Sequence, residues 1–291
     1  MSKKNPEYDF KWCPGCGDFG VRRAVEMAMQ ERIVRTEEPM EKNVVVAGIG
    51  CSGNLVHLLE GPQPYGFHGI HGRTLPIAMG VKMGRPDINV LIVAGDGDFL
   101  SIGGEHIAPQ AQRNLNVCCV IMDNGVYGLT KGQSSPTSDL GVITTSTPFG
   151  KVEMELDPLD YYLTSGVSFI ASGVSTKPRD LAKLINAGME HPGFSIIHVQ
   201  SPCTQYNDTY ELLKGNKKKG IEPIVRDVLE EHDPSDREAA YKLIHSDRLP
   251  IGIIYKDESR ASFHARAQEV QSNAKLRTAE EQLDSFEFQT S

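Results

Sequence analysis

The residues best suited to chemistry lie at the ends of two apolar runs in the middle of the chain. The first run ends in Gly95-Asp96-Gly97-Asp98 and the second in Asp123-Asn124-Gly125. Asn124 follows Asp96 by 28 positions, which leaves room for one helix between two strands. Mg²⁺ takes oxygen ligands and often few from the protein, so an Asp, an Asn and a backbone carbonyl leave room for phosphate oxygens. The pair therefore predicts a site for a divalent metal and a diphosphate.

This spaced pair resembles the thiamine diphosphate motif, which begins Gly-Asp-Gly and ends in Asn after an interval of this size. The resemblance implies that Asp96, Asn124 and the carbonyl of Val126 hold the metal. It also places further residues at the cofactor, namely Gly95, Gly97, Asp98, Gly128, Leu129 and Thr130. The alternative is that Gly-Asp-Gly is a plain turn and Asn124 a helix cap.

Four of the six cysteines form a second candidate site. Cys13 and Cys16 flank a Pro-Gly turn, and their two-residue spacing lets both thiolates reach one metal centre. Alone, this pair could also be half of a zinc knuckle or a redox disulfide. Cys51 and Cys203 each follow a predicted strand, so we expect them near the same crevice. Four thiolates without a comparable histidine favour an iron-sulfur cluster, with structural zinc as the alternative.

The elements that position these residues are predicted from apolar patterns. Continuous β-branched runs indicate strands buried on both faces, and helical spacing between them indicates helices, so the fold class is α/β with a parallel sheet covered on both faces. Pro109 should kink or shorten one helix. We expect strands at 43–50, 89–95, 117–122, 167–170, 194–199 and 249–255, and helices at 18–34, 75–83, 104–113 and 179–190. Ligands bind beyond the carboxyl ends of such strands.

The two remaining cysteines, Cys118 and Cys119, are neighbours in one apolar run. Their side chains must point to opposite faces of a strand, so they cannot easily share a metal and are predicted to be core residues.

The organisation of the chain changes near residue 203. We expect an α/β domain over 1–203, including the cluster-binding N-terminal segment, and a C-terminal extension and arm over 204–291. Within the extension, 223–246 can form two short helices. The stretch after Asp257 has too few apolar residues for a core of its own, so it should lie on this subunit or on a partner.

The composition bounds the class of protein. With 291 residues and 39% hydrophobic content, the chain can form one large core with appendages or at most two small domains. The net charge of −8 argues against nucleic acid or an anionic membrane as a partner. The start of the chain is polar and no apolar run is long enough to span a bilayer, so a cytoplasmic location with reduced thiols is expected.

Several motifs together resemble the β subunit of 2-oxoacid:ferredoxin oxidoreductases, over roughly residues 10 to 257. They are Trp12-Cys13-Pro14-Gly15-Cys16-Gly17, Gly48-Ile49-Gly50-Cys51-Ser52, His71-Gly72-Arg73, Gly95-Asp96-Gly97-Asp98 and the run from Asn124 to Gln133. The resemblance implies coenzyme A-dependent oxidative decarboxylation of a 2-oxoacid to an acyl-CoA and CO2, with ferredoxin as electron acceptor and reverse carboxylation possible. It implies one 4Fe-4S cluster on Cys13, Cys16, Cys51 and Cys203.

The same resemblance implies a thiamine diphosphate site lined by Ile49, Gly50, Cys51, Ser52 and His71. The candidate catalytic residues are His71, Arg73 and Lys131, the first two because they follow a glycine-rich loop. His68 could be confused with His71 on sequence alone. Lys131 is a plausible partner for a substrate carboxylate or the diphosphate, although a lysine in a polar loop is as often merely solvated.

The chain lacks a second α/β domain of the kind that activates the aminopyrimidine ring of the cofactor. The resemblance therefore implies a separate α subunit, in an αβ or (αβ)₂ assembly, and an external ferredoxin. The run Lys131 to Thr137 occurs in family members acting on 2-oxoglutarate and on pyruvate, and 2-oxoglutarate is favoured. Two alternatives stay open. A non-redox thiamine diphosphate enzyme subunit would not need the four cysteines, and a zinc-binding structural module would not need the diphosphate motif.

Overall fold

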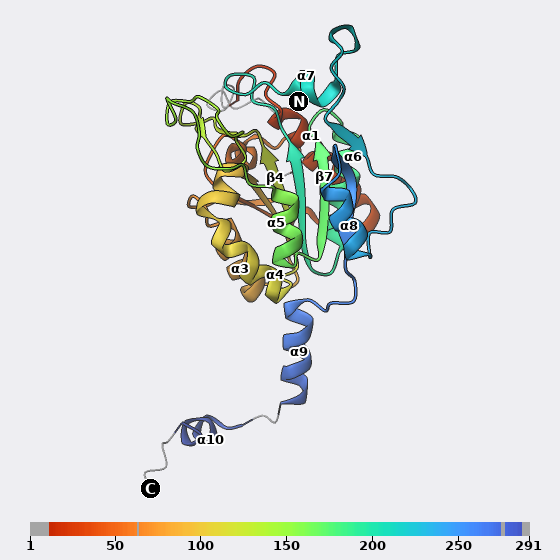
Figure 1. The fold of residues 1–291 in the computed structure, drawn as a ribbon. Helices are drawn as coiled ribbons and strands as arrows, with labels where there is room; N and C mark the ends of the chain where they lie inside the picture. The colour runs from red at the N-terminus through yellow and green to blue at the C-terminus, as the bar shows by residue number, and fades with distance from the viewer. Residues whose placement is uncertain (1–11, 63, 275–276, 287–291) are drawn as a thin grey trace.

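Six of the eight strands in the central sheet form where the sequence has continuous apolar runs (Figure 1). The computed structural model describes residues 12–62, 64–274 and 277–286. In space the strand order is β2-β1-β3-β4-β8-β7-β10-β9. The strands are β1 (Asn43–Ala47), β2 (Tyr65–His68), β3 (Asn89–Gly95), β4 (Val117–Asp123), β7 (Phe169–Val174), β8 (Phe194–Gln200), β9 (Val225–Asp227) and β10 (Leu249–Lys256). A separate hairpin joins β5 (Val126–Tyr127) to β6 (Gln133–Ser134).

The sheet is mostly parallel, as expected, but its last two strands run in the opposite direction to the others. Strand β10 pairs with β7 in the antiparallel direction, and β9 runs parallel to β10. The physical reason is the connection after β8, which contains only the short helix α7 (Tyr210–Lys214) and the 3₁₀ turn Lys217–Lys219. The chain has no crossover helix there to carry it back to the start of the sheet, so β9 runs in the reverse direction.

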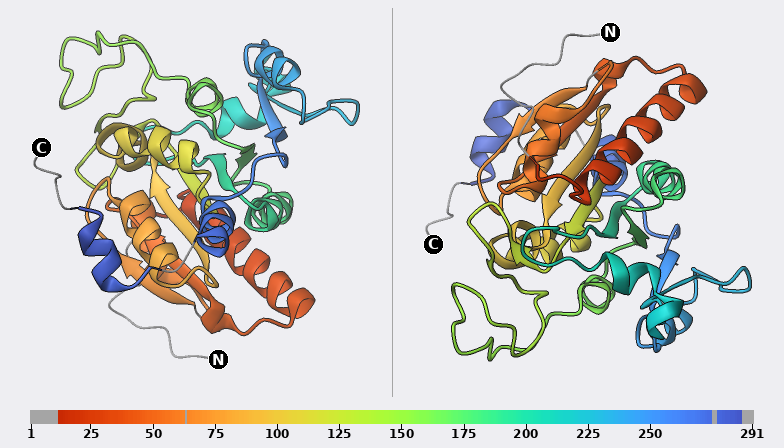
Figure 2. Two further views of the ribbon diagram at one scale, coloured as in Figure 1. Left: turned by 90° about the horizontal axis from the view of Figure 1, so that it is seen from below. Right: turned by 90° about the horizontal axis from the view of Figure 1, so that it is seen from above.

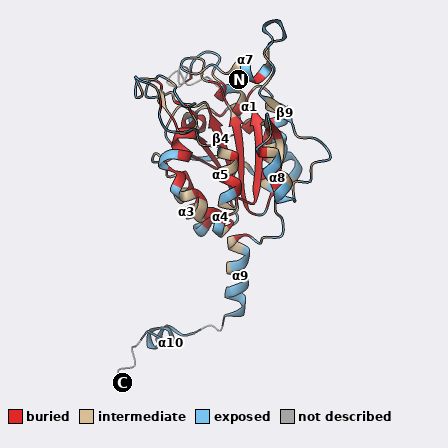
Figure 3. Ribbon diagram, in the orientation of Figure 1, coloured by how far each residue is buried: buried red, intermediate tan, exposed pale blue. Residues whose placement is uncertain are grey.

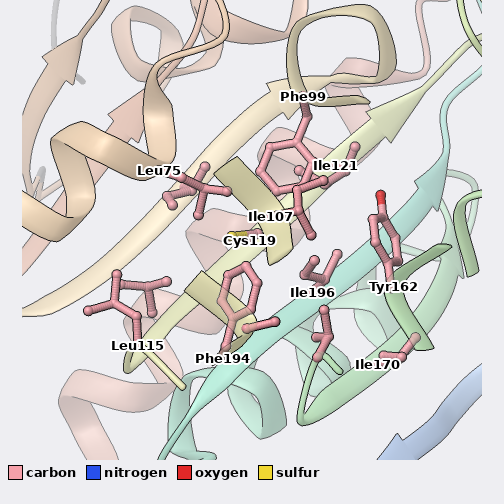
Figure 4. Packing of buried hydrophobic residues seen from close by; sticks show 14 of the residues in the cluster. Leu75, Phe99, Ile107, Leu115, Cys119, Ile121, Tyr162, Ile170, Phe194 and Ile196 are labelled. Carbon is pink, nitrogen blue, oxygen red and sulfur yellow. The ribbon is translucent and has the colours of Figure 1, made fainter. Parts of the chain in front are cut away.

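Helices cover both faces of the sheet, as expected (Figure 2). On one face lie α1 (Asp18–Thr36), α2 (Leu55–Leu58) and α6 (Pro178–Glu190), packed on a core that includes Cys118. On the other lie α3 (Thr74–Gly84), α4 (Ile107–Arg113), α5 (Pro158–Ser165) and α8 (Arg237–Ile244), on a core that includes Cys119. Figure 4 shows Cys119 among Leu75, Phe99 and Phe194. The prediction that these two cysteines are core residues on opposite faces is confirmed.

Proline shortens the helix before β4, as predicted. Residues Gly104–His106 form a 3₁₀ turn and α4 begins only at Ile107, so Pro109 lies in its first turn, where no N–H donor is needed.

The expectation of two helices over 223–246 is wrong for the first, because Val225–Asp227 pairs with β10 as β9. Short 3₁₀ turns also occur at Met40–Lys42 and Ser52–Asn54.

The polar end of the chain leads away from the sheet. Helices α9 (Phe263–Asn273) and α10 (Ala279–Asp284) have no buried residue (Figure 3). Arg260 fixes the start of this arm by donating to the carbonyls of Gly166 and Ala111, each at 2.7 Å. The boundary at residue 203 stays a prediction, since β9 and β10 extend the same sheet. The polar start of the chain, within 1–11, and residues 287–291 lie outside the described residues.

Across the described residues, no helix is both long and apolar enough to cross a membrane.

Asn114 joins three segments at the end of the sheet where β4 begins, opposite the carboxyl ends of the parallel strands. Its Oδ1 accepts from the Ser168 hydroxyl (2.6 Å) and the Phe194 N–H (3.0 Å), and its Nδ2 donates to the Arg260 carbonyl (2.9 Å). The residue is buried and has φ 49°, which Asn tolerates. Asn114→Ala should therefore lower the free energy of unfolding by about 2–4 kcal/mol, measured by urea denaturation. Asn114→Gly loses the same hydrogen bonds but tolerates the positive φ, so its free energy of unfolding should be about 1 kcal/mol higher than that of Asn114→Ala. A change below about 0.5 kcal/mol in Asn114→Ala would refute this role.

Candidate active site

A pocket opens at the carboxyl ends of β1, β3 and β4, the edge of the sheet where the sequence predicts the metal and diphosphate site. Its empty volume is about 550 Å³ with the open mouth included, the size of a cofactor site. All the residues predicted to hold the metal and the cofactor line it. The lining is Ile49, Gly50, Cys51, Ser52, His71, Gly95, Asp96, Gly97, Asp98, Asn124, Val126, Tyr127, Gly128, Leu129 and Thr130.

Asp96 and Asn124 lie together, as the alignment of two neighbouring parallel strands requires. Gly95 of β3 is paired with Met122 of β4, so the residues that follow each strand emerge side by side. The carboxylate of Asp96 accepts a hydrogen bond from the backbone N–H of Asn124 and another from the Thr137 hydroxyl, at 2.9 Å. The site thus offers a buried carboxylate next to a half-buried amide, the oxygen donors that Mg²⁺ takes.

Two buried carboxylates meet below this site. Burial, and then the nearby charge of Asp123, raise the pKa of Asp96 to about 7. Burial also opposes ionisation of Asp123, but the hydrogen bond and charge of His198 outweigh it and lower the pKa of Asp123. His198 Nε2 lies 2.9 Å from Asp123 Oδ2, and its Nδ1 lies 3.2 Å from the Tyr162 hydroxyl. Asp96 therefore lacks a positive partner among the described residues, and a divalent cation fits that need.

Asp98 holds the opposite wall of the pocket. It lies in a π-helix, Gly97–Ile102, that follows β3 directly, a helix type that is common at functional sites. Its Oδ1 accepts from the N–H groups of Gly72 (2.8 Å) and Ile49 (3.1 Å) and contacts His71 Nδ1. Its Oδ2 is buried without a hydrogen-bond partner in the described structure. A Cβ on Gly48 would lie 1.7 Å from that oxygen, so the approach of the two segments requires glycine.

Two of the three candidate catalytic residues lie outside the pocket lining. Arg73 donates to the carbonyls of Ile102 (2.8 Å) and Gly72 (3.1 Å) and pairs with Glu105 (3.3 Å), so it secures the end of the π-helix. Lys131 is exposed, in the turn between β5 and β6, with φ 85°. Their catalytic roles stay predictions.

The four predicted cluster cysteines gather beside the pocket. A Cβ on Gly128 would lie 3.6 Å from Cys51 Sγ and 3.8 Å from Cys203 Sγ, so both sulfurs border the same pocket residue. Cys16 is close enough to interact electrostatically with Cys51 and Cys203, and Cys51 with Cys13. Cys13 is exposed and the other three are half-buried.

Two properties of these thiols bear on metal binding. In the described part of the chain, no three His, Cys, Asp or Glu side chains are grouped to hold one metal ion. Burial, followed by the charge of Asp18, raises the pKa of Cys51 to about 12 and that of Cys16 as well. Any metal that these two thiols bind would therefore have to displace their protons.

The comparisons with known proteins agree with this geometry. The family model "Thiamine pyrophosphate enzyme, C-terminal TPP binding domain" matches residues 48–199, and the model of the C-terminal part of the pyruvate ferredoxin oxidoreductase β subunit matches 221–272. The 2-oxoacid:ferredoxin oxidoreductase 2, subunit beta, of Aeropyrum pernix is 36% identical over 267 residues, which are 89% of this chain and 84% of that one. The chain belongs to the 2-oxoacid:ferredoxin oxidoreductase β subunits.

Two further relatives of this protein have more specific names. The 2-oxoglutarate synthase subunit KorB of Archaeoglobus fulgidus is 36% identical over 192 residues, 66% of this chain and 69% of that one. Among solved structures, the 2-oxoglutarate:ferredoxin oxidoreductase from Magnetococcus marinus with 2-oxoglutarate, coenzyme A and succinyl-CoA bound matches with a TM-score of 0.82 and 34% identity. That match covers 95% of this chain and 92% of the other.

Sequence reasoning missed two kinds of residue in this β subunit. Tyr127 lines the pocket and donates its hydroxyl to the Gly97 carbonyl at 3.1 Å. A Cβ on Gly97 would lie 2.3 Å from the Tyr127 ring, so that glycine makes room for it. The motif contained Tyr127, which could have been found there. His198 and Asp18 had no such signal, because their partners are distant in the sequence.

The choice between His71 and His68 can be tested directly. His71 lines the pocket of the β subunit and contacts Asp98, whereas His68 lies on the exposed edge strand β2, with Nδ1 2.6 Å from His57 Nε2. His71→Ala should weaken binding of thiamine diphosphate by about 10–100-fold, because it removes a pocket wall and a partner of Asp98. His68→Ala is the matched control and should bind normally in calorimetric titration with Mg²⁺ present. Equal losses in both variants would contradict the assignment.

Proposed function

We propose that this β subunit, with a separate α subunit, catalyses the coenzyme A-dependent oxidative decarboxylation of 2-oxoglutarate, with pyruvate as the next candidate. Electrons would leave one at a time through a 4Fe-4S cluster to ferredoxin, and the reverse carboxylation is possible. The observation that carries the proposal is the double position of Cys51. This residue lines the diphosphate pocket, and its sulfur borders Gly128 together with that of Cys203. A cluster on these thiols would adjoin the cofactor.

The residues present fit both groups. Asp96, Asn124 and the Val126 carbonyl would hold Mg²⁺, and Cys13, Cys16, Cys51 and Cys203 would hold the cluster. Thiamine diphosphate supplies the electron sink for decarboxylation. The chain itself closes the floor of the pocket with the Asp96 and Asp123 network, and holds the walls with Asp98 and Tyr127.

Exposed apolar side chains near the pocket support a partner subunit. Leu129 lines the pocket and is 50% exposed. The segment after Thr137, whose hydroxyl donates to Asp96, presents Ile143, Phe149 and Met154 with at least 70% exposure. Large exposed apolar groups on one segment are typical of an interface. An α subunit seated there would cover the open side of the cofactor site.

The substrate is proposed from the relatives. The Magnetococcus marinus structure contains bound 2-oxoglutarate, and the Archaeoglobus fulgidus relative is named for 2-oxoglutarate. The test measures the rate at which the complex of both subunits reduces ferredoxin with 2-oxoglutarate or with pyruvate as substrate, with and without coenzyme A. We expect kcat/KM at least about 10-fold higher for 2-oxoglutarate, dependence on coenzyme A, and no turnover by the β subunit alone. Equal rates on pyruvate would overturn the substrate, and robust turnover by the single chain would overturn the need for a partner.

A further inference from the structure

Asp18 is a fully buried carboxylate that is not among the residues proposed to hold the metal, the cofactor or the cluster. It is the first residue of α1 and follows Cys16 by two positions. Its Oδ1 accepts a hydrogen bond from the Ser201 hydroxyl at 2.6 Å, and its Oδ2 accepts one from the Ser52 hydroxyl at 3.2 Å. Ser52 directly follows Cys51, and Ser201 precedes Cys203 by two positions. One side chain therefore connects all three segments that carry the predicted cluster cysteines.

These segments come from distant parts of the sequence and meet only at the edge of the sheet. The first precedes α1, the second follows β1, and the third follows β8. Their other direct connections run between two segments at a time. The Gly17 N–H donates to the Pro202 carbonyl at 3.0 Å, and the Trp12 indole N–H donates to the Cys51 carbonyl at 2.7 Å. A Cβ on Gly17 would lie 2.6 Å from Ser201 Oγ, so the first and third segments are already in close contact.

The position is costly for a carboxylate. Burial raises the pKa of Asp18 to about 6, against the hydrogen bonds from Ser201 and Ser52, which lower it. Asp18 also opposes ionisation of the Cys16 and Cys51 thiols. The backbone N–H of the same residue donates to Cys16 Sγ. In the part of the chain that the structure describes, Asp18 forms no ion pair, so the hydrogen bonds from Ser201 and Ser52 offset the free energy cost of its burial.

We propose that Asp18 is a positioning residue for the four-cysteine site, and that its two hydrogen bonds hold the three cysteine-bearing segments at the separation a cluster needs. The inference rests on the proposed function, because the cluster itself belongs to that proposal. The inference goes beyond the proposed function because it assigns the assembly of the four-cysteine site to Asp18, which is not a ligand. Loss of the two hydrogen bonds loosens the Cys51 and Cys203 segments at the start of α1, where the Trp12–Cys51 and Gly17–Pro202 hydrogen bonds remain.

The test compares variants of the full chain purified without oxygen. Asp18→Ala removes both hydrogen bonds and should lower iron and acid-labile sulfide per chain by about 10-fold, as loss of a residue that supports metal ligands does. Asp18→Asn keeps one acceptor, and its amide can donate to the other serine, so it should keep most of the iron. Asn114→Ala is the matched control, since it loses a buried hydrogen-bonding side chain at the far end of the sheet and should keep the iron.

A second measurement works on the metal-free chain. Iodoacetamide labelling, followed by mass spectrometry of peptides, should be faster at Cys16 and Cys51 in Asp18→Ala than in Asp18→Asn. Both variants lack the carboxylate charge, so the difference reports the hydrogen bonds alone. Cys13, which is exposed, is the internal reference.

The outcomes separate the two proposals. If the wild-type chain holds no iron and sulfide, the cluster of the proposed function fails, and the labelling rates alone decide the role of Asp18. Wild-type iron content in Asp18→Ala, or equal labelling in the two Asp18 variants, overturns the positioning role. So does an equal loss of iron in Asn114→Ala, because general destabilisation would then explain the result.

Discussion

Replacing Asp96 by asparagine is expected to abolish Mg²⁺-dependent binding of thiamine diphosphate and to make the metal-free chain more stable. Asparagine keeps an oxygen for the Thr137 hydroxyl but lacks the charge that holds the metal. The loss of affinity should exceed about 100-fold, more than removal of a supporting residue costs. The same substitution ends the repulsion between two buried carboxylates, Asp96 and Asp123.

The pH dependence of this gain follows from the raised pKa of Asp96. Its folded value of about 7 lies above its ordinary value of 3.8, so between these limits the folded chain holds a proton that the unfolded chain has lost. The contribution of Asp96 to stability therefore falls as pH rises from about 4 to 7. The full effect is at most about 4 kcal/mol.

The measurement is urea denaturation of both proteins without metal, at pH 5 and at pH 8. The excess stability of Asp96→Asn over wild type should be larger at pH 8, and adding Mg²⁺ with thiamine diphosphate should stabilise only the wild type. A variant that is less stable than wild type at pH 8 would show that Asp96 is not held under strain. A variant that still binds the cofactor would show that Asp96 is not the metal ligand.

Replacing Cys203 by alanine should remove the cluster and leave the thiamine site intact. Cys203 borders the pocket residue Gly128 but does not line the pocket itself. Iron per chain and the rate of ferredoxin reduction should therefore each fall more than about 100-fold, since a metal site loses more with a ligand than with a supporting residue. Binding of thiamine diphosphate should stay within about twofold of wild type, well inside the loss a wall residue would cause.

Cys118→Ala is the control for this variant. It also removes one sulfur, but from the core facing α6, where Cys118 Sγ lies 3.9 Å from the Ile185 carbonyl. It should lower the free energy of unfolding by about 1–2 kcal/mol and leave iron content unchanged. Iron lost equally from both variants would mean that the four predicted cysteines do not form the site. Iron is measured together with sulfide, so that adventitious metal is not counted.

The part of the fold that carries the site could be predicted because its signals are local. Continuous β-branched runs gave β3 without error and β4 to within one residue at its end. The strand expected at 167–170 lies at Phe169–Val174, since Ser172 and Gly173 interrupt the apolar run. Strand β2 was missed because Tyr65–His68 is exposed throughout and forms the edge of the sheet. The reversed direction of β9 and β10 depends on the path of the preceding connection, which no periodicity encodes.

The same division holds within the site. Asp96, Asn124 and Cys51 follow β3, β4 and β1, which run parallel in one sheet, so topology alone brings them to one crevice. The residues that hold them in place were not predictable. Thr137 reaches Asp96 from a long loop, His198 of β8 reaches Asp123 of the neighbouring β4, and Asp18 depends on Ser52 and Ser201. Such contacts arise from packing between segments that share no sequence pattern.

The diphosphate pocket and the four-cysteine site are proposed to act together. The most direct measurement is the electron paramagnetic resonance spectrum of the complex of both subunits, taken after 2-oxoglutarate is added without oxygen. We expect the signal of a reduced 4Fe-4S cluster in the wild type, and no such signal in Asp96→Asn, which keeps its iron, or in Cys203→Ala, which has lost it. A full signal in Asp96→Asn, or a wild-type cluster that the substrate does not reduce, would contradict the claim.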